Sequence, residues 1–168
     1  MIYLKLVVNG KPVTGAGAIV GYEGQIEIES FTWKIKVNHT EEPNGSVRTE
    51  KLPKWIHLSK FFDPATPNLC THMAAKTQFK TATITMLNAV STGDRDEPTK
   101  VMQLTLKDGR IEEIGITASE SGKAIALKEK LTLSYATSEL NYHPMDVVRM
   151  TRGKKAMMFE LITPSSKT

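Results

Sequence analysis

The sequence has one cysteine, Cys70, among its 168 residues. A single thiol cannot form an intrachain disulfide, nor can it complete a metal site made of four thiolates. The fold must therefore be stabilised by packing, as is usual for proteins that fold in a reducing compartment. A chain of this length can bury enough apolar surface to form one stable domain.

Long hydrophobic runs are also absent. No apolar stretch approaches the ~20 residues that a helix needs to span a bilayer. Residues 1–10 contain neither the basic start nor the cleavage site of a secretory signal. We therefore expect no membrane insertion and, if the protein is exported, export without a cleavable signal peptide.

Charge of one sign is not concentrated anywhere along the chain. The 22 lysines and arginines interleave with 18 aspartates and glutamates, and the net charge is +4. A protein that binds nucleic acid more often gathers its cations on one element, together with aromatic side chains. The sequence therefore predicts no nucleic-acid partner.

The residue patterns of familiar active sites are missing as well. The histidines, at positions 39, 57, 72 and 143, do not have the spacing of a metal site. No glycine pattern for nucleotide binding occurs, and no nucleophile stands out with a general base. We predict a protein that is not an enzyme and has no cofactor and no metal. A hydrolase whose site is assembled from distant residues is the weakest alternative.

What the sequence does contain is a series of segments with strand character. In residues 25–37 the apolar positions change parity near Glu29 and Ser30, which predicts a long strand with a β-bulge. Many short strands joined by turns are typical of a sandwich or a barrel. The segments, separated by turn signals such as Asn-Gly and Asp-Gly, are residues 2–8, 25–37, 55–62, 79–87, 100–107, 111–118, 124–142 and 156–162.

Two segments interrupt the strand pattern. Residues 38–54 are a long polar stretch with two prolines, which predicts a loop with a functional role. Residues 66–76 have the pattern of a helix, in which Thr66 can act as the cap and Pro67 suits the first helical position.

Together these features predict an all-β fold, a compact two-sheet β-barrel with one short helix at about residues 66–76. We expect a single domain over residues 1–163 with a long loop at 38–54, and a frayed tail at 164–168. A β domain has sheet edges that need protection, and pairing them with copies of the same chain in a closed ring is one solution. A monomeric β-barrel that binds a small apolar ligand in an internal cavity is the alternative.

Three stretches, in the same order, resemble one known family. Residues 26–33 (IEIESFTW) resemble the second strand of the haemolysin-coregulated protein (Hcp) family, the tube subunit of type VI secretion. Residues 58–69 (LSKFFDPATPNL), with 74–76, resemble the step from strand to helix in that family. The third stretch resembles the family's late strands and consists of residues 102–107, 114–118, 129–136 (EKLTLSYA) and 142–144. The sequence departs from the family at Lys34, where a glycine is usual, and after Pro144, which also leaves a phage-tail-tube relative open.

The resemblance implies a β-barrel of two sheets with one helix, six copies of which form a ring, and rings that stack into a hollow tube. The partners it implies are further copies of the chain, the spike at the tube tip, the contractile sheath and small effector proteins carried in the lumen. The protein would begin in the bacterial cytoplasm and then be secreted.

The resemblance and the strand parity together nominate surface positions for assembly. The loop at 38–54 corresponds to the family's loop that reaches toward neighbouring subunits. Thr32, Lys34 and Lys36 lie opposite the apolar parity of their strand and are candidates for the lumen or a subunit interface. The complete set of candidate interface or lumen residues is Thr32, Lys34, Lys36, Glu41, Glu42, Asn44, Val47, Arg48 and Lys51.

Overall fold

The structure is a computed structural model of the chain. It describes residues 1–36, 38–41, 45, 47–50, 54–88, 98–121, 124–143 and 157–159, with backbone only for 38–41, 47–50, 121 and 157–159. The strands are β1 (Ile2–Val8), β2 (Lys11–Pro12), β3 (Ile26–Ile28), β4 (Ser30–Trp33), β5 (Asn38–Glu41), β6 (Val47–Glu50), β7 (Trp55–Phe61), β8 (Gln78–Asn88), β9 (Thr99–Ser121), β10 (Ala124–Ser134), β11 (Thr137–Tyr142) and β12 (Met157–Phe159), and the helix is α1 (Thr66–Ala74).

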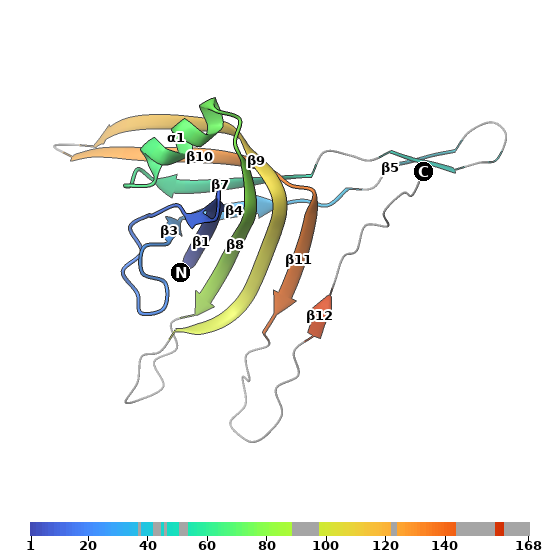
Figure 1. The fold of residues 1–168 in the computed structure, drawn as a ribbon, viewed down its shortest axis with the longest axis horizontal. Coiled ribbons are helices and arrows are strands. Elements are labelled where there is room, and N and C mark those ends of the chain that lie inside the picture. The colour runs from blue at the N-terminus through green and yellow to red at the C-terminus, as the bar shows by residue number, and fades with distance from the viewer. Residues whose placement is uncertain are drawn as a thin grey trace, which may run out of the picture.

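The described strands, apart from β5 and β6, form one antiparallel sheet that folds back over its own core. The strand order along the sheet is β2-β1-β8-β9-β10-β7-β4, with β3 on β1, β11 on β9 and β12 on β11. Figure 1 shows the sheet curving around the core, with α1 near one end of β9 and β10. The all-β class with one short helix is thus as predicted, but the two ends of the strand order, β2 and β4, do not pair and the described barrel stays open.

The predicted bulge at Glu29 separates two strands that pair differently. β3 pairs with β1 before it, and β4 pairs with β7 after it. Ile26 and Ile28 are buried, whereas Phe31 and Trp33 carry the apolar parity after the slip. The prediction that this strand continues to residue 37 is wrong, because β4 ends at Trp33. The bulge is therefore the point where one chain segment passes from one part of the sheet to another.

The longest strand, β9, runs without a break through the Asp108-Gly109 pair that was predicted to be a turn. Asp108 has φ 53°, and a β-carbon added at Gly109 would overlap the carbonyl oxygen of Ser134 and the ring of Phe79. The glycine thus permits close packing at a bend rather than a reversal. Before the bend β9 lies between β8 and β11, and after it β9 pairs with β10.

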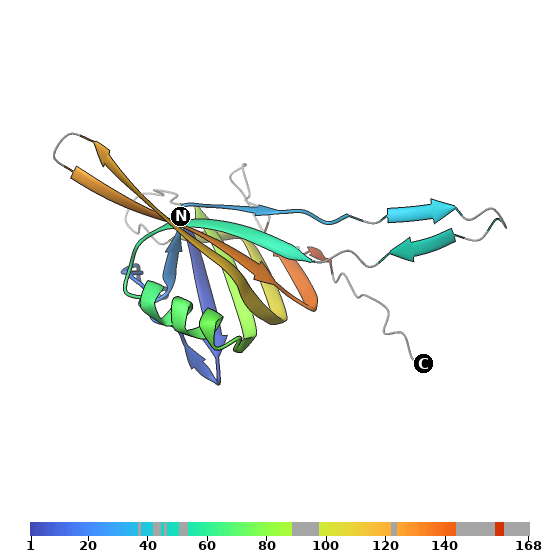
Figure 2. The same ribbon diagram turned by 90° about the horizontal axis from the view of Figure 1, so that it is seen from above.

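The single strand predicted over residues 124–142 is divided at Tyr135 and Ala136 into β10 and β11. Its odd positions from 125 to 135 are apolar except at Glu129, a pattern that predicts one core-facing side. Leu131 and Leu133 are buried, but Ile125 is 74% exposed and Leu127 is 37% exposed. The first part of β10 therefore extends beyond the core together with the end of β9, as Figure 2 shows for this β9–β10 hairpin.

The helix forms where the sequence predicts it, but its cap differs. The N-cap residue is Ala65, with no side-chain cap hydrogen bond, and a proline lies in the first turn. Thr66 is instead buried, and its hydroxyl donates a hydrogen bond of 2.6 Å to Glu129. Leu69 is fully buried and Met73 packs against the core. The helix is thus tied to the sheet by one apolar face and one buried hydroxyl.

Residues 38–54, expected to be a loop, contain a β-hairpin, which we call the arm. β5 and β6 pair with each other over Glu41↔Val47 to Asn38↔Glu50 and form a sheet of their own. Figure 2 shows the arm projecting from the end of the molecule opposite to the β9–β10 hairpin. The sequence did not reveal this strand pair, because residues 38–41 (NHTE) and 47–50 (VRTE) are mostly polar and lack the apolar alternation used to detect strands.

Candidate assembly surfaces

Four strands present a polar outward face, which we call the four-strand face. They are β4, β7, β10 and the part of β9 that follows its bend, in adjacent positions. The register places Thr32, His57, Thr132 and Glu113 abreast in one row across them. Directly opposed residues of antiparallel strands point to the same side of a sheet, so these polar side chains share one face while Leu58 and Leu131 fill the other.

Two neighbouring residues of this row on the four-strand face contact each other through their side chains. His57 Nδ1 lies 3.0 Å from the hydroxyl of Thr132. A shallow hollow runs along the same row and the next, lined by Ser30, Phe31, Thr32, His57, Leu58, Ser59, Glu113, Lys130, Leu131 and Thr132. Hydroxyls, an imidazole, a carboxylate and an ammonium group make this a hydrated surface of mixed charge, suited to facing a solvent-filled space.

An exposed ion pair extends the four-strand face toward the β9–β10 hairpin. Lys128 Nζ lies 2.7 Å from Glu29 Oε1, and Ser59 donates a hydrogen bond of 3.2 Å to the same carboxylate. The hydrogen bond from Lys128 lowers the pKa of Glu29. Lys128 also lies 5.2 Å above the centre of the Phe61 ring. These contacts fix the bulge at Glu29 to β7 and β10.

The two sides of this four-stranded part of the sheet are unpaired edges in the part of the chain that the structure describes. β4 pairs only with β7. On its other side, β8 accompanies β9 only as far as Arg110, so residues 111–121 pair with β10 alone. An edge strand presents backbone N–H and C=O groups that can pair with another chain. The subunit therefore offers two different strand edges, one on each side.

The predicted assembly residues fall on two separate parts of the molecule. Thr32 is exposed on the four-strand face, and Lys34 and Lys36 are exposed after the end of β4, at the root of the arm. Glu41, Val47 and Arg48 lie in the paired strands of the arm, where only the backbone is described. The remaining three candidates, Glu42, Asn44 and Lys51, lie outside the described residues.

A buried polar network, which the sequence reading did not single out, ties the helix to the sheet. Lys60 is fully buried, and its ammonium group lies 2.8 Å from Asp63 Oδ1 and 3.0 Å from Glu129 Oε2. It also donates hydrogen bonds to the carbonyl of Phe61 and the hydroxyl of Thr66. Glu129 is likewise fully buried. One ammonium thus faces two carboxylates, and one oxygen of each carboxylate has no hydrogen-bond partner among the described residues.

The alternation of buried and exposed positions along β7 and β10 indicates this network. Lys60 follows Ile56 and Leu58 on the buried parity of β7, and Glu129 precedes Leu131 and Leu133 on that of β10. Opposite charges at core-facing positions of two strands indicate a buried pair, since an unpaired buried charge is very costly. The register indeed places Glu129 opposite Lys60.

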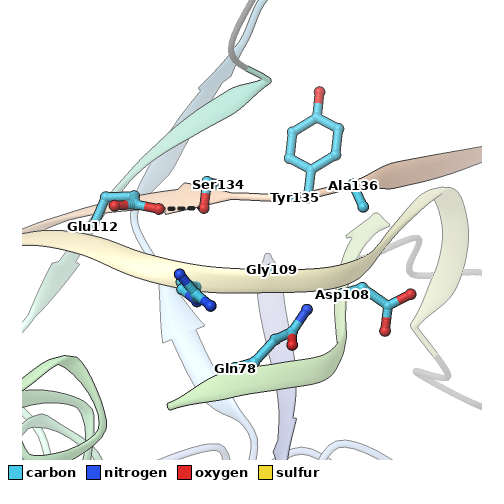
Figure 3. A pocket seen from close by; sticks show the side chains of 8 residues that line it. Gln78, Asp108, Gly109, Glu112, Ser134, Tyr135 and Ala136 are labelled. Carbon is cyan, nitrogen blue, oxygen red and sulfur yellow. Dashed lines mark hydrogen bonds between the residues drawn. The ribbon is translucent and has the colours of Figure 1, made fainter. Parts of the chain in front are cut away.

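A second hollow lies at the bend of β9 and is shown in Figure 3. It is lined by Gln78, Asp108, Gly109, Arg110, Glu112, Ser134, Tyr135 and Ala136. Ser134 donates a hydrogen bond to Glu112, and the Tyr135 hydroxyl accepts one of 2.6 Å from the indole of Trp33. None of the described lining residues is a histidine beside Ser134. Among the described residues, no three potential ligands are grouped to hold a metal ion.

No helix in the described part of the chain is long and apolar enough to cross a membrane.

Solved structures share this fold at low sequence identity. A mutant Hcp1 from Escherichia coli EAEC 042 superposes with a TM-score of 0.70 at 15% identity, over 95% of this chain and 97% of that one. Hcp1 from Salmonella typhimurium gives a TM-score of 0.65 at 20% identity, over 95% and 94%. A sheath/tube terminator of an extracellular contractile injection system gives 0.51 at 12% identity, over 83% and 91%.

The sequence itself shows the family. No curated protein matches it significantly. The profile of one protein family, described as "Type VI secretion system effector, Hcp", matches residues 3–142. The match spans most of the chain and includes the three stretches that carry the resemblance, the third of them as far as Tyr142, so the predicted family is confirmed. The chain belongs to the Hcp family, the family of the tube subunits of type VI secretion.

Proposed function

We propose that the chain acts as a structural, non-enzymatic subunit of the type VI secretion tube by closing into hexameric rings that stack. The observation that supports ring closure is the pair of unpaired strand edges on the two sides of the four-strand face. β4 of one copy meets residues 111–121 of β9 in the next. Because the two edges are different surfaces, the contact is heterologous and repeats around a ring until the ring closes.

Ring closure of this kind turns the four-strand face toward the lumen of the ring. The repeated sheet forms a continuous wall, with its polar side toward the lumen and its apolar side toward the core of each subunit. The hydrated row that includes Thr32 and His57 then lines the channel through which small effector proteins pass. The spike at the tip and the contractile sheath are the further partners, and the subunit leaves the bacterial cytoplasm through the machine rather than by a cleavable signal.

The first test is the mass of the purified protein in solution by light scattering coupled to size exclusion. A ring has a mass of about six times 18.6 kDa. A monomer at every concentration would contradict the proposal.

A disulfide scan then locates the ring contact. In a Cys70→Ser background, Thr32→Cys is combined in turn with Glu113→Cys, Gly115→Cys and Thr117→Cys, which share the outward parity of β9. Within one subunit Thr32 and Glu113 are separated by three strand spacings, roughly 14 Å, and a disulfide needs α-carbons within about 7 Å. Any disulfide must therefore join two subunits. We expect a ladder of cross-linked species ending at six for at least one pair, whereas intact rings without a ladder in all three would rule out edge pairing.

A further inference from the structure

The root of the arm lacks the strand pairing that is present on either side of it. The arm leaves the body of the subunit through two chain segments, one that follows β4 and one that precedes β7. Pairing in the body ends at Trp33↔Ile56, and pairing in the arm begins at Asn38↔Glu50. Among the described residues no strand pair joins these two points. The direction of the arm relative to the body therefore depends on other contacts at its root.

Tyr135 contacts both of these segments. Its hydroxyl accepts the hydrogen bond of 2.6 Å from the indole N–H of Trp33, the last residue of β4. Its backbone N–H donates a hydrogen bond of 3.2 Å to the carbonyl of Lys54, on the returning segment. The ammonium group of Lys54 in turn donates a hydrogen bond of 3.1 Å to the carbonyl of Ala136. Residues 135 and 136 thus hold the outgoing and the returning segment of the arm.

The break between β10 and β11 makes Tyr135 available for these contacts. β10 ends at Ser134 and β11 begins at Thr137, and Tyr135 is paired with no residue of β9 in either register. Its backbone N–H is therefore free of the sheet ladder and can bond to Lys54. Figure 3 shows its ring pointing away from Asp108, on the other side of the β9 bend.

The side chain of Tyr135 is anchored in the core, which suits it to hold a segment that is otherwise unsupported. The ring is buried in the core cluster, and the indole of Trp33 packs partly buried against the same cluster. A buried donor or acceptor without a partner is costly, so the hydroxyl and the indole N–H favour the arrangement in which they meet. An arm that is held in one direction loses less conformational freedom when it contacts a partner.

We propose that Tyr135 is the positioning residue of the arm. It fixes the direction in which the arm leaves the subunit, before the arm contacts any partner. The inference rests on the proposed function only in that the arm takes part in assembly. The direction of the arm is a property of a single chain and is measured without a tube.

Pulsed electron paramagnetic resonance between two spin labels measures this direction. In a Cys70→Ser background one label is attached at Asn68→Cys on α1 and the other at Thr49→Cys in the arm. Labelled chains are mixed with an excess of unlabelled chains in denaturant and refolded, so that the distances come from single chains. We expect a narrow distance distribution in the parent and a several-fold broader one in Tyr135→Phe, which lacks the hydroxyl.

Two controls separate the arm from the rest of the subunit. Tyr142→Phe also removes one tyrosine hydroxyl, but from an exposed side chain at the other end of β11, and it should leave the arm distance unchanged. A label pair within the body, Asn68→Cys with Lys100→Cys, should give the same distance in every variant.

Trp33→Phe removes the donor of the same hydrogen bond and is the second variant. It should broaden the arm distance as Tyr135→Phe does. The double variant should be no broader than either single variant, because the two groups act through one bond. Broadening that adds up in the double variant would mean that ring packing rather than this bond positions the arm, and it would overturn the proposal.

Ultraviolet resonance Raman spectroscopy detects the hydrogen bond itself. The chain has two tryptophans, so Trp55→Phe leaves the indole of Trp33 as the single signal. We expect its N–H band at the position of a hydrogen-bonded group in this background, and a shift toward the position of an unbonded group when Tyr135→Phe is added. A band that does not shift would overturn the proposal.

The outcomes also separate this inference from the proposed function. A broader arm distance in Tyr135→Phe and Trp33→Phe, with an unchanged body distance, supports the inference whether or not rings form. An unchanged arm distance in both variants overturns it and leaves the proposed ring intact, and a broader body distance would show a general loss of structure and overturn it as well. A mass of one chain at every concentration would instead overturn the proposed function and leave the measured arm direction valid.

Discussion

At the scale of single residues, the buried network has more negative than positive charge. Lys60 faces both Asp63 and Glu129, so Lys60→Met would leave the fully buried carboxylate of Glu129 and the partly buried one of Asp63 with no cation. Removing one partner of a buried ion pair typically costs about 3–5 kcal/mol. Glu129→Gln leaves the pair of Lys60 with Asp63 intact and should cost less, about 1–3 kcal/mol. Denaturant unfolding measures both values.

The double variant Lys60→Met/Glu129→Leu is the control for this prediction. It replaces the pair of Lys60 with Glu129 by apolar groups of similar size, and such replacements are often close to neutral. Asp63 is then the one carboxylate of the network left without a cation, and it keeps the hydrogen bond from the backbone N–H of Ala65. We therefore expect the double variant to recover part of the stability lost in Lys60→Met. Should Lys60→Met unfold at the same denaturant concentration as the parent, the network would have no stabilising role.

Gly109 contributes to the stability of the fold in another way, because neighbouring atoms occupy the space that a β-carbon would need. In Gly109→Ala that carbon would overlap the Ser134 carbonyl and the Phe79 ring, and overpacking of this kind costs about 1–3 kcal/mol. Gly115→Ala, in the same strand, meets nothing within 4 Å and should be neutral or slightly stabilising. Thermal unfolding of the two variants side by side decides the prediction, and equal melting temperatures would contradict it.

At the scale of elements, strands were predictable where one face is buried. β1, β7 and β8 follow apolar patterns, and the bulge at Glu29 was visible as a change of parity. The arm was missed because its two strands are mostly polar and show no apolar alternation. The Asp108-Gly109 pair was read as a turn because turn chemistry is local, while its real role depends on the distant Phe79.

The candidate surfaces were predictable to a smaller extent. The parity of Thr32 placed it on the polar side of β4, where it is exposed. The exposure of Ile125 and Leu127 was hidden because both follow the same pattern as the buried Leu131 and Leu133. Apolar residues at every second position show which side of a strand is apolar, but they do not show where along the strand the core ends.

The arm also permits a prediction about a whole element. Replacing residues 38–50 with a short Gly-Ser linker removes a ribbon that pairs with no other described strand. The melting temperature of the dilute protein should therefore stay within a few degrees of the parent, and rings should still form. Stacking should be lost, as judged by electron microscopy, and normal stacks would show that the arm has no part in tube assembly.

At the scale of the whole molecule, stability and assembly are linked. In the described part of the chain the sheet of one subunit is open, with β4 and the second part of β9 unpaired on their outer edges. If ring closure pairs these edges, the ring stabilises the folded state relative to unfolded monomers, and the melting temperature must rise with protein concentration. We expect a rise of several degrees over a hundredfold range for the parent protein and a similar rise for the arm deletion, which keeps the ring contact. The contrary result would be a melting temperature that does not change with concentration, together with a mass by light scattering that stays that of one chain. The open sheet would then be stable without neighbours, and its edges would not drive ring formation.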